Sequence, residues 1–113
     1  MADIKIRKAT GTWVVRAGGA VLAESKNALE LSEPGYGDVI YFPREDIAMA
    51  FLEESDHVSH CPHKGDARYF SIVTKSQTLE NVGWSYETPI EAVARIKEHI
   101  AFTPGDYLAV ERV

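Results

Sequence analysis

The sequence has 113 residues, and its 17 acidic side chains outnumber 12 basic ones, so the formal net charge is −5 at pH 7. Because a domain usually has about 100 to 200 residues, we expect a single domain over residues 1–113. The hydrophobic content of 45% is typical of a soluble globular protein, and the lack of a dense Lys and Arg cluster argues against a nucleic-acid partner bound through its phosphates.

The first predicted element is a β-hairpin. Two segments rich in apolar residues, Thr12–Ala17 and Ala20–Glu24, flank the dipeptide Gly18-Gly19. Two glycines supply the positive φ angles of a tight turn without strain, which is typical of a hairpin. Apolar residues lie on both faces of each arm, so we expect strands that are covered on both sides.

The middle of the chain predicts a turn, a loop, a strand and a first helix. Lys26–Leu31 fits a short helical turn, and the proline and glycines of residues 34–37 enforce a loop after it. Asp38–Phe42 is rich in β-branched and aromatic residues, which indicates a strand. Pro43 suits the first position of a helix, and two acidic residues follow it, so we expect a helix over about Pro43–Glu54.

The second half of the chain predicts further strands and a second helix. The expected extended segments are His57–Cys61, Ala67–Thr74, Asn81–Glu87 and Tyr107–Arg112. A threonine N-cap, a proline after it and apolar residues at helical spacing indicate a helix over about Pro89–Ile100. About seven short strands joined mainly by hairpins predict an α+β fold, mostly antiparallel, with two helices.

The cysteine content and the chain's apolar segments bear on where the protein works. Cys61 is the only cysteine, so an internal disulfide is excluded and a small secreted scaffold is disfavoured. The N-terminal segment lacks the apolar run of a secretory signal, and no apolar stretch approaches the ~20 residues that cross a bilayer. We therefore expect a cytoplasmic protein with no membrane partner.

The densest polar cluster combines three histidines with the cysteine and a lysine: His57, His60, Cys61, His63 and Lys64. On a strand, His57 and Cys61 share one face while His60 points to the other. Structural zinc usually takes four ligands, often from two separated pairs, and the chain has no second pair. We expect a histidine-rich exposed edge with no metal, and no cofactor motif is found that would predict a cofactor.

Cys61 and Lys64 are the candidate catalytic residues, and two interpretations of Cys61 stay open. Lys64 and His63 would favour the thiolate, which is the form a reactive cysteine needs. Alternatively, Cys61 is a small buried hydrophobic residue, as free cysteines commonly are. Gly65, next to Lys64, is a position where the backbone can approach a ligand.

Three further side chains can be structural or functional. A cation at Arg44 opposes the dipole of the predicted helix. It is either neutralised by neighbours such as Asp46 or held to present its guanidinium to a carboxylate or phosphate. Trp84 and Tyr86 alternate on one strand and face the same way, so they form either part of the core or the wall of a ligand pocket.

Four segments in this order resemble the domain of unknown function 427 family: Tyr41–Ile47, Cys61–Tyr69, Trp84–Pro89 and Ala101-Phe102. The resemblance extends from about Trp13 to Val110 and implies two packed sheets in a tent-like or barrel-like arrangement. The family pattern matches at the residues that we take as ligand-binding candidates, namely Arg44, Asp46, Cys61, Lys64, Gly65, Trp84 and Tyr86.

The resemblance implies no established activity. A nucleotidyltransferase label is sometimes attached to the family, but the sequence has neither a glycine-rich phosphate cradle nor a paired-aspartate metal site. The residues themselves favour a domain that binds a small anionic molecule, with an unidentified enzymatic activity compatible with the same site. Arg44 and Lys64 would hold the anion, Trp84 and Tyr86 would form the walls, and Cys61 would form the floor.

Two alternatives come from other function classes. One is a thiol-dependent enzyme that uses Cys61 as its nucleophile. The other is a non-catalytic protein-interaction module in which the same motifs only hold the fold.

Overall fold

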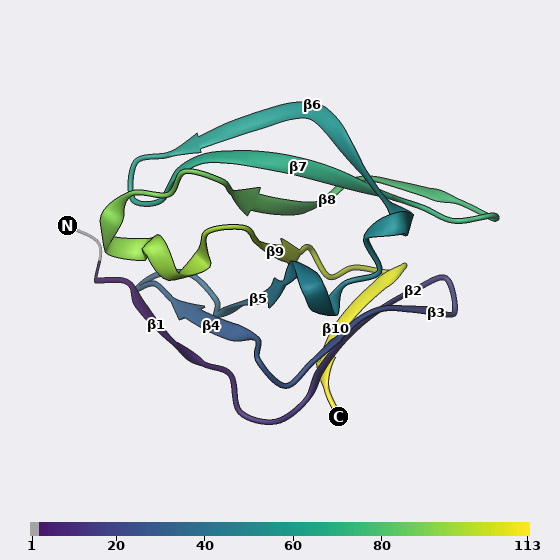
Figure 1. Cartoon of the computed structure of the whole chain (residues 1–113), viewed down its shortest axis with the longest axis horizontal. Helices are drawn as coiled ribbons and strands as arrows, with labels where there is room; N and C mark the ends of the chain where they lie inside the picture. The colour runs from purple at the N-terminus through teal and green to yellow at the C-terminus, as the bar shows by residue number, and fades with distance from the viewer. Residues whose placement is uncertain (1–2) are drawn as a thin grey trace.

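The computed structural model describes residues 3–113, which form ten strands and three short 3₁₀ segments (Figure 1). The strands are β1 (Lys5–Lys8), β2 (Trp13–Ala17), β3 (Ala20–Ser25), β4 (Leu29–Ser32), β5 (Val39–Pro43), β6 (Leu52–Cys61), β7 (Gly65–Val73), β8 (Thr78–Tyr86), β9 (His99–Phe102) and β10 (Leu108–Arg112). The 3₁₀ segments are η1 (Arg44–Asp46), η2 (Met49–Phe51) and η3 (Glu91–Ile96).

The strands form two sheets. The larger has seven strands in the order β1-β4-β5-β9-β8-β7-β6, and the smaller has three in the order β10-β2-β3. Neighbouring strands pair antiparallel throughout both sheets. In Figure 1 the small sheet lies at the lower right and η3 at the left. The left and right sides of the large sheet therefore have different neighbours in this view. The predicted mostly antiparallel fold with two packed sheets is confirmed.

The core divides into two clusters because successive residues of a strand point to opposite faces. Phe42 and Ile100 of the large sheet pack with Leu22 of the small sheet, and all three side chains are fully buried. On the other face, Tyr41 of β5 packs in one cluster with Ile96 of η3. The second face is the one that carries the candidate site described below.

The predicted hairpin is present as β2 and β3, with Ala17 opposite Ala20 at the turn. Gly18 and Gly19 have φ angles of 56° and 82°, the left-handed region for which glycine is suited. A tight turn between two apolar strands is therefore confirmed at this point of the chain.

The predicted helix over Pro43–Glu54 is wrong. The segment instead forms η1 and η2, and β6 begins at Leu52. Its internal backbone bonds are short-range turn bonds, such as Ile47 to Arg44 and Phe51 to Ala48. Between them the chain bonds to β3: the Ala48 amide donates to the Leu22 carbonyl at 2.8 Å, and Ile47 forms a bridge with Ala23. These contacts bury Ile47 against the small sheet, and they take the place of the bonds that a helix would make within itself.

The predicted helix over Pro89–Ile100 is also wrong. Only the short 3₁₀ helix η3 forms, with a kink at Val93 and no side-chain cap. Glu98 adopts a positive φ of 61°, and the chain then enters β9 at His99. Strand β9 pairs with β5 and β8 in the middle of the large sheet, so sheet pairing of the residues around Ile100 outweighs the helical spacing of the apolar side chains.

Three smaller expectations need correction. The helical turn expected at Lys26–Leu31 is replaced by β4, and β1 and β9 were not predicted as strands. The large sheet is not a closed barrel, because β1 and β6 are its two edges and do not pair with each other. No helix among residues 3–113 is long and apolar enough to cross a membrane.

Candidate ligand-binding cleft

A cleft of about 570 Å³ opens on the second face of the large sheet, between the loop after β4, the β6–β7 turn and β8. This volume lies within the range of about 300 to 1,000 Å³ that is typical of small-molecule sites. Its walls are mainly aromatic, with surface from Tyr36, Tyr41, Tyr69, Trp84 and Tyr86. Polar atoms come from Glu33, His60, Cys61, His63 and Lys64.

Because side chains alternate along β8, two of the predicted residues, Trp84 and Tyr86, face this cleft. Trp84 and Tyr86 lie two positions apart on β8 and both line it. Ser85, between them, points to the other face and is fully buried. The Trp84 indole Nε1 donates to the Tyr41 hydroxyl at 3.3 Å, which fixes both rings against each other.

Lys64 reaches the cleft through the turn that joins β6 to β7. Its backbone amide donates to the Cys61 carbonyl at 3.1 Å, so the turn folds Lys64 back over Cys61. The Lys64 ammonium donates to the Glu33 carboxylate at 2.9 Å, and the two side chains are only 13% and 9% exposed. Burial alone would lower the Lys64 pKa, but the Glu33 hydrogen bond and the nearby Cys61 raise it above its usual value. Lys64 is therefore an ammonium at neutral pH.

Two tyrosines line the cleft together with this pair. Tyr41 is 1% and Tyr86 is 5% exposed. Burial raises the pKa of both phenols, so both stay protonated and able to donate. Within residues 3–113 the Tyr86 hydroxyl has no hydrogen-bond partner, although its side chain lines the cleft.

Gly65 lies beside the cleft and allows two backbone segments to pack closely there. Its φ is 116°, and a Cβ at this position would stand 3.3 Å from the Thr88 carbonyl oxygen. The Ile90 amide donates to the Lys64 carbonyl at 3.0 Å. Glycine thus lets the β6–β7 turn lie directly against the segment that leads into η3, which holds Lys64 in place.

Arg44 and Asp46 lie away from the cleft. The Arg44 guanidinium donates to Ser85 at 3.0 Å and pairs with Glu87 at 2.5 Å. The Ser85 side chain is on the face of β8 opposite to the cleft, so Arg44 and Lys64 do not converge on one ligand group. Asp46 accepts a hydrogen bond from Ser25 at 2.6 Å and ties η1 to the end of β3.

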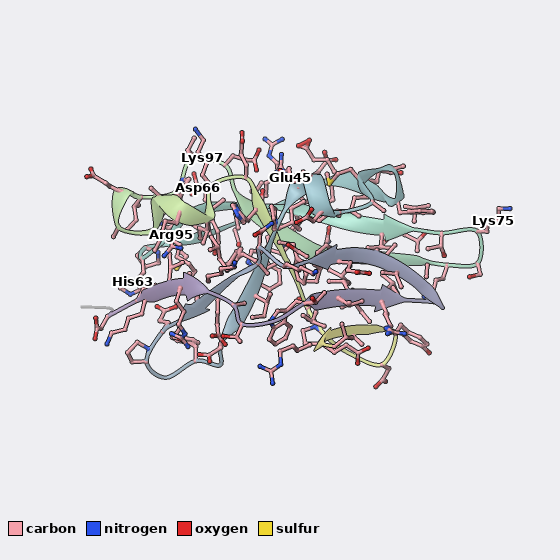
Figure 2. The ribbon with its side chains drawn as sticks, turned by 60° about the horizontal axis from the view of Figure 1, so that its bottom comes forward. Glu45, His63, Asp66, Lys75, Arg95 and Lys97 are labelled. Atoms are coloured by element: carbon pink, nitrogen blue, oxygen red, sulfur yellow. The ribbon has the colours of Figure 1, made fainter. Side chains whose placement is uncertain are left out.

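The three histidines of the polar cluster lie along the exposed edge strand β6 and the turn after it. His57 stacks edge-on against Tyr69 with ring centroids 4.5 Å apart, and His60 pairs with Asp66 at 2.6 Å. Figure 2 shows His63 at the end of the molecule that also carries Asp66, opposite the hairpin tip at Lys75. Over residues 3–113, no three His, Cys, Asp or Glu side chains gather as metal ligands would.

Sequence reasoning missed Glu33 and the tyrosines other than Tyr86. Glu33 precedes Lys64 by 31 residues, and no local pattern connects them. Tyr41 and Tyr69 stand on predicted strands, and their alternation with core residues was the signal that could have placed them on the cleft side.

Comparison with known families agrees with this architecture. A family profile described as "Domain of unknown function (DUF427)" matches residues 5–113. The chain belongs to this family. The match covers both sheets and every residue of the cleft in this DUF427 protein. No curated protein matches the chain.

Proposed function

We propose that this DUF427 protein binds a small molecule in the cleft on the second face of its large sheet. The observation that supports this most directly is that Lys64 and Tyr86 line the same aromatic-walled cleft, where the Tyr86 hydroxyl has no hydrogen-bond partner within residues 3–113. A hydroxyl donor that is open at the wall of a cleft is a place for an acceptor atom of a ligand.

The ligand chemistry follows from these groups. An ammonium has three N–H donors, and Glu33 takes one of those of Lys64. A carboxylate of the ligand would accept from the remaining donors and from Tyr86, while its apolar part would lie against Trp84 and Tyr69. Because Glu33 already offsets the Lys64 charge, the anion is held by directed hydrogen bonds more than by net attraction.

Three probes test this proposal: benzoate, its neutral counterpart benzamide, and the non-aromatic cyclohexanecarboxylate. We expect benzoate to bind most tightly and to shift the amide NMR signals of β8 and the β6–β7 turn. Lys64→Met should weaken benzoate binding by about tenfold, the usual effect of losing a charge-assisted hydrogen bond. Arg44→Met removes a cation outside the cleft, so it should leave affinity within about twofold.

The amide spectrum of each variant in the absence of probe shows whether the fold is kept. Equal affinity for benzoate and benzamide would reject the anionic ligand class. If no probe perturbs the cleft residues of the wild type, the binding function itself is wrong.

A further inference from the structure

Cys61 has a more specific environment than a packing residue needs. It ends β6, lines the cleft and is partly exposed. The turn that follows folds Lys64 back over Cys61, and both side chains line the same cleft. A cysteine sulfur at the wall of a cleft can be reached by an electrophile bound there.

Lys64 itself is unsuited to be the nucleophile. An amine must lose its proton before it can attack a carbonyl carbon. Lys64 is held as an ammonium by Glu33 at 2.9 Å, in a site where both side chains are largely buried. The structure therefore gives Lys64 the task of a fixed positive charge and leaves Cys61 as the nucleophile of the cleft.

Tyr86 supplies an independent indication of a ligand at the same place. Its side chain is 5% exposed, lines the cleft with Cys61, and has a hydroxyl without a partner within residues 3–113. Cys61 packs against the same buried cluster to which Tyr86 belongs. A hydroxyl donor near a nucleophile is the arrangement that stabilises negative charge developing on a carbonyl oxygen.

We propose that Cys61 adds to the carbon–carbon double bond of an α,β-unsaturated carbonyl compound held in the cleft. This inference rests on the proposed function and names its ligand class more closely. The thiol first releases its proton to solvent. The sulfur then bonds to the β-carbon, the π electrons move to the carbonyl oxygen, and Tyr86 donates a hydrogen bond to that oxygen.

A proton from solvent completes the reaction at the α-carbon. The net change is addition of S–H across the double bond, so atoms and electrons balance without an oxidant, a reductant or a leaving group. Acyl transfer would need in addition a group to protonate the leaving atom and a base to activate water. Conjugate addition needs only the sulfur, the fixed cation and the hydroxyl donor that the cleft provides.

The test uses 4-phenyl-3-buten-2-one as the electrophile and intact-protein mass spectrometry as the readout. Wild-type protein should gain one adduct, at least about tenfold faster than N-acetylcysteine at the same pH, and Cys61→Ser should gain none. Iodoacetamide, which needs no carbonyl activation, reports the general reactivity of the thiol. Tyr86→Phe should slow enone addition by about tenfold while changing the iodoacetamide rate by less than about twofold.

Two control variants keep the experiment interpretable. Tyr107→Phe removes an exposed phenol outside the cleft, and Lys75→Met removes an exposed charge at the far hairpin tip. Neither should alter the rate ratio of enone to iodoacetamide. An enone rate in the wild type equal to that of N-acetylcysteine overturns the inference, as does an unchanged rate ratio in Tyr86→Phe.

Binding of the saturated ketone 4-phenyl-2-butanone to Cys61→Ser separates this inference from the proposed function. If the ketone binds but the wild type does not react with the enone, the cleft is a binding site without thiol chemistry. If the ketone fails to bind and the enone fails to react, both proposals are wrong.

Discussion

At the scale of single residues, the ion pair between Glu33 and Lys64 organises the cleft. It joins the loop after β4 to the β6–β7 turn, and both side chains are largely buried. A buried pair of this kind contributes little when it is intact, because desolvation of the two charges offsets their attraction. Removal of one partner is costly, since the other charge then stays buried without compensation.

Replacement of Glu33 by glutamine should therefore lower the free energy of unfolding by roughly 3 kcal/mol. The matched control is Glu30→Gln, which breaks the more exposed pair with Arg7 and should cost less than about 1 kcal/mol. Urea denaturation of the two variants measures the difference. The double variant Glu33→Gln, Lys64→Met should recover part of the loss. Equal losses in Glu33→Gln and Glu30→Gln would contradict the burial of the Glu33–Lys64 pair.

The candidate site could be predicted in part from single residues. Strand alternation placed Trp84 and Tyr86 on one face, and a dense run of reactive side chains pointed to Cys61 and Lys64. Glu33 could not be found this way, because it meets Lys64 only through the pairing of distant strands. Arg44 was grouped with Lys64 although β8 separates them, since composition and spacing do not tell on which face of a sheet a side chain ends.

At the scale of elements, hairpins were predictable and helices were not. A hairpin depends on a turn and two adjacent strands, all of which are local in the sequence. The two predicted helices contain good starting signals. In the fold, however, strands β3 and β5 lie beside these segments and supply backbone hydrogen-bond partners. Ala48 bonds to β3, and Ile100 pairs with Phe42 in β5. The periodicity of apolar residues along the chain cannot predict such non-local bonds.

The β6–β7 turn is the element on which the geometry of the site depends most. Gly65→Ala should destabilise the protein by about 2 kcal/mol, because alanine disfavours a φ of 116° and its Cβ would crowd the Thr88 carbonyl. It should also shift the amide signals of Lys64 and Ile90. Gly105→Ala is the control, since an added Cβ there meets nothing within 4 Å and the φ is ordinary. Similar stability of the two variants would contradict a strained, closely packed turn.

At the scale of the whole molecule, the cleft makes stability depend on pH in the alkaline range. The pKa values of Tyr41, Lys64 and Tyr86 are all raised in the folded protein. Each group therefore keeps its proton in the folded state at a pH where the unfolded chain has begun to lose it. The resulting stabilisation is complete below the ordinary tyrosine pKa of 10.0 and is lost as the pH rises above it.

Tyr86→Phe isolates one of these contributions. Between about pH 8 and about pH 11, the free energy of unfolding of the wild type should fall more steeply than that of the variant, by up to about 1.4 kcal/mol per pH unit above the tyrosine pKa. Urea denaturation at a series of pH values gives both curves. Tyr107 is 67% exposed, so Tyr107→Phe should follow the wild-type curve. Parallel curves for wild type and Tyr86→Phe would mean that the phenol of Tyr86 titrates as freely in the fold as in the unfolded chain, which would contradict its burial at the wall of the cleft.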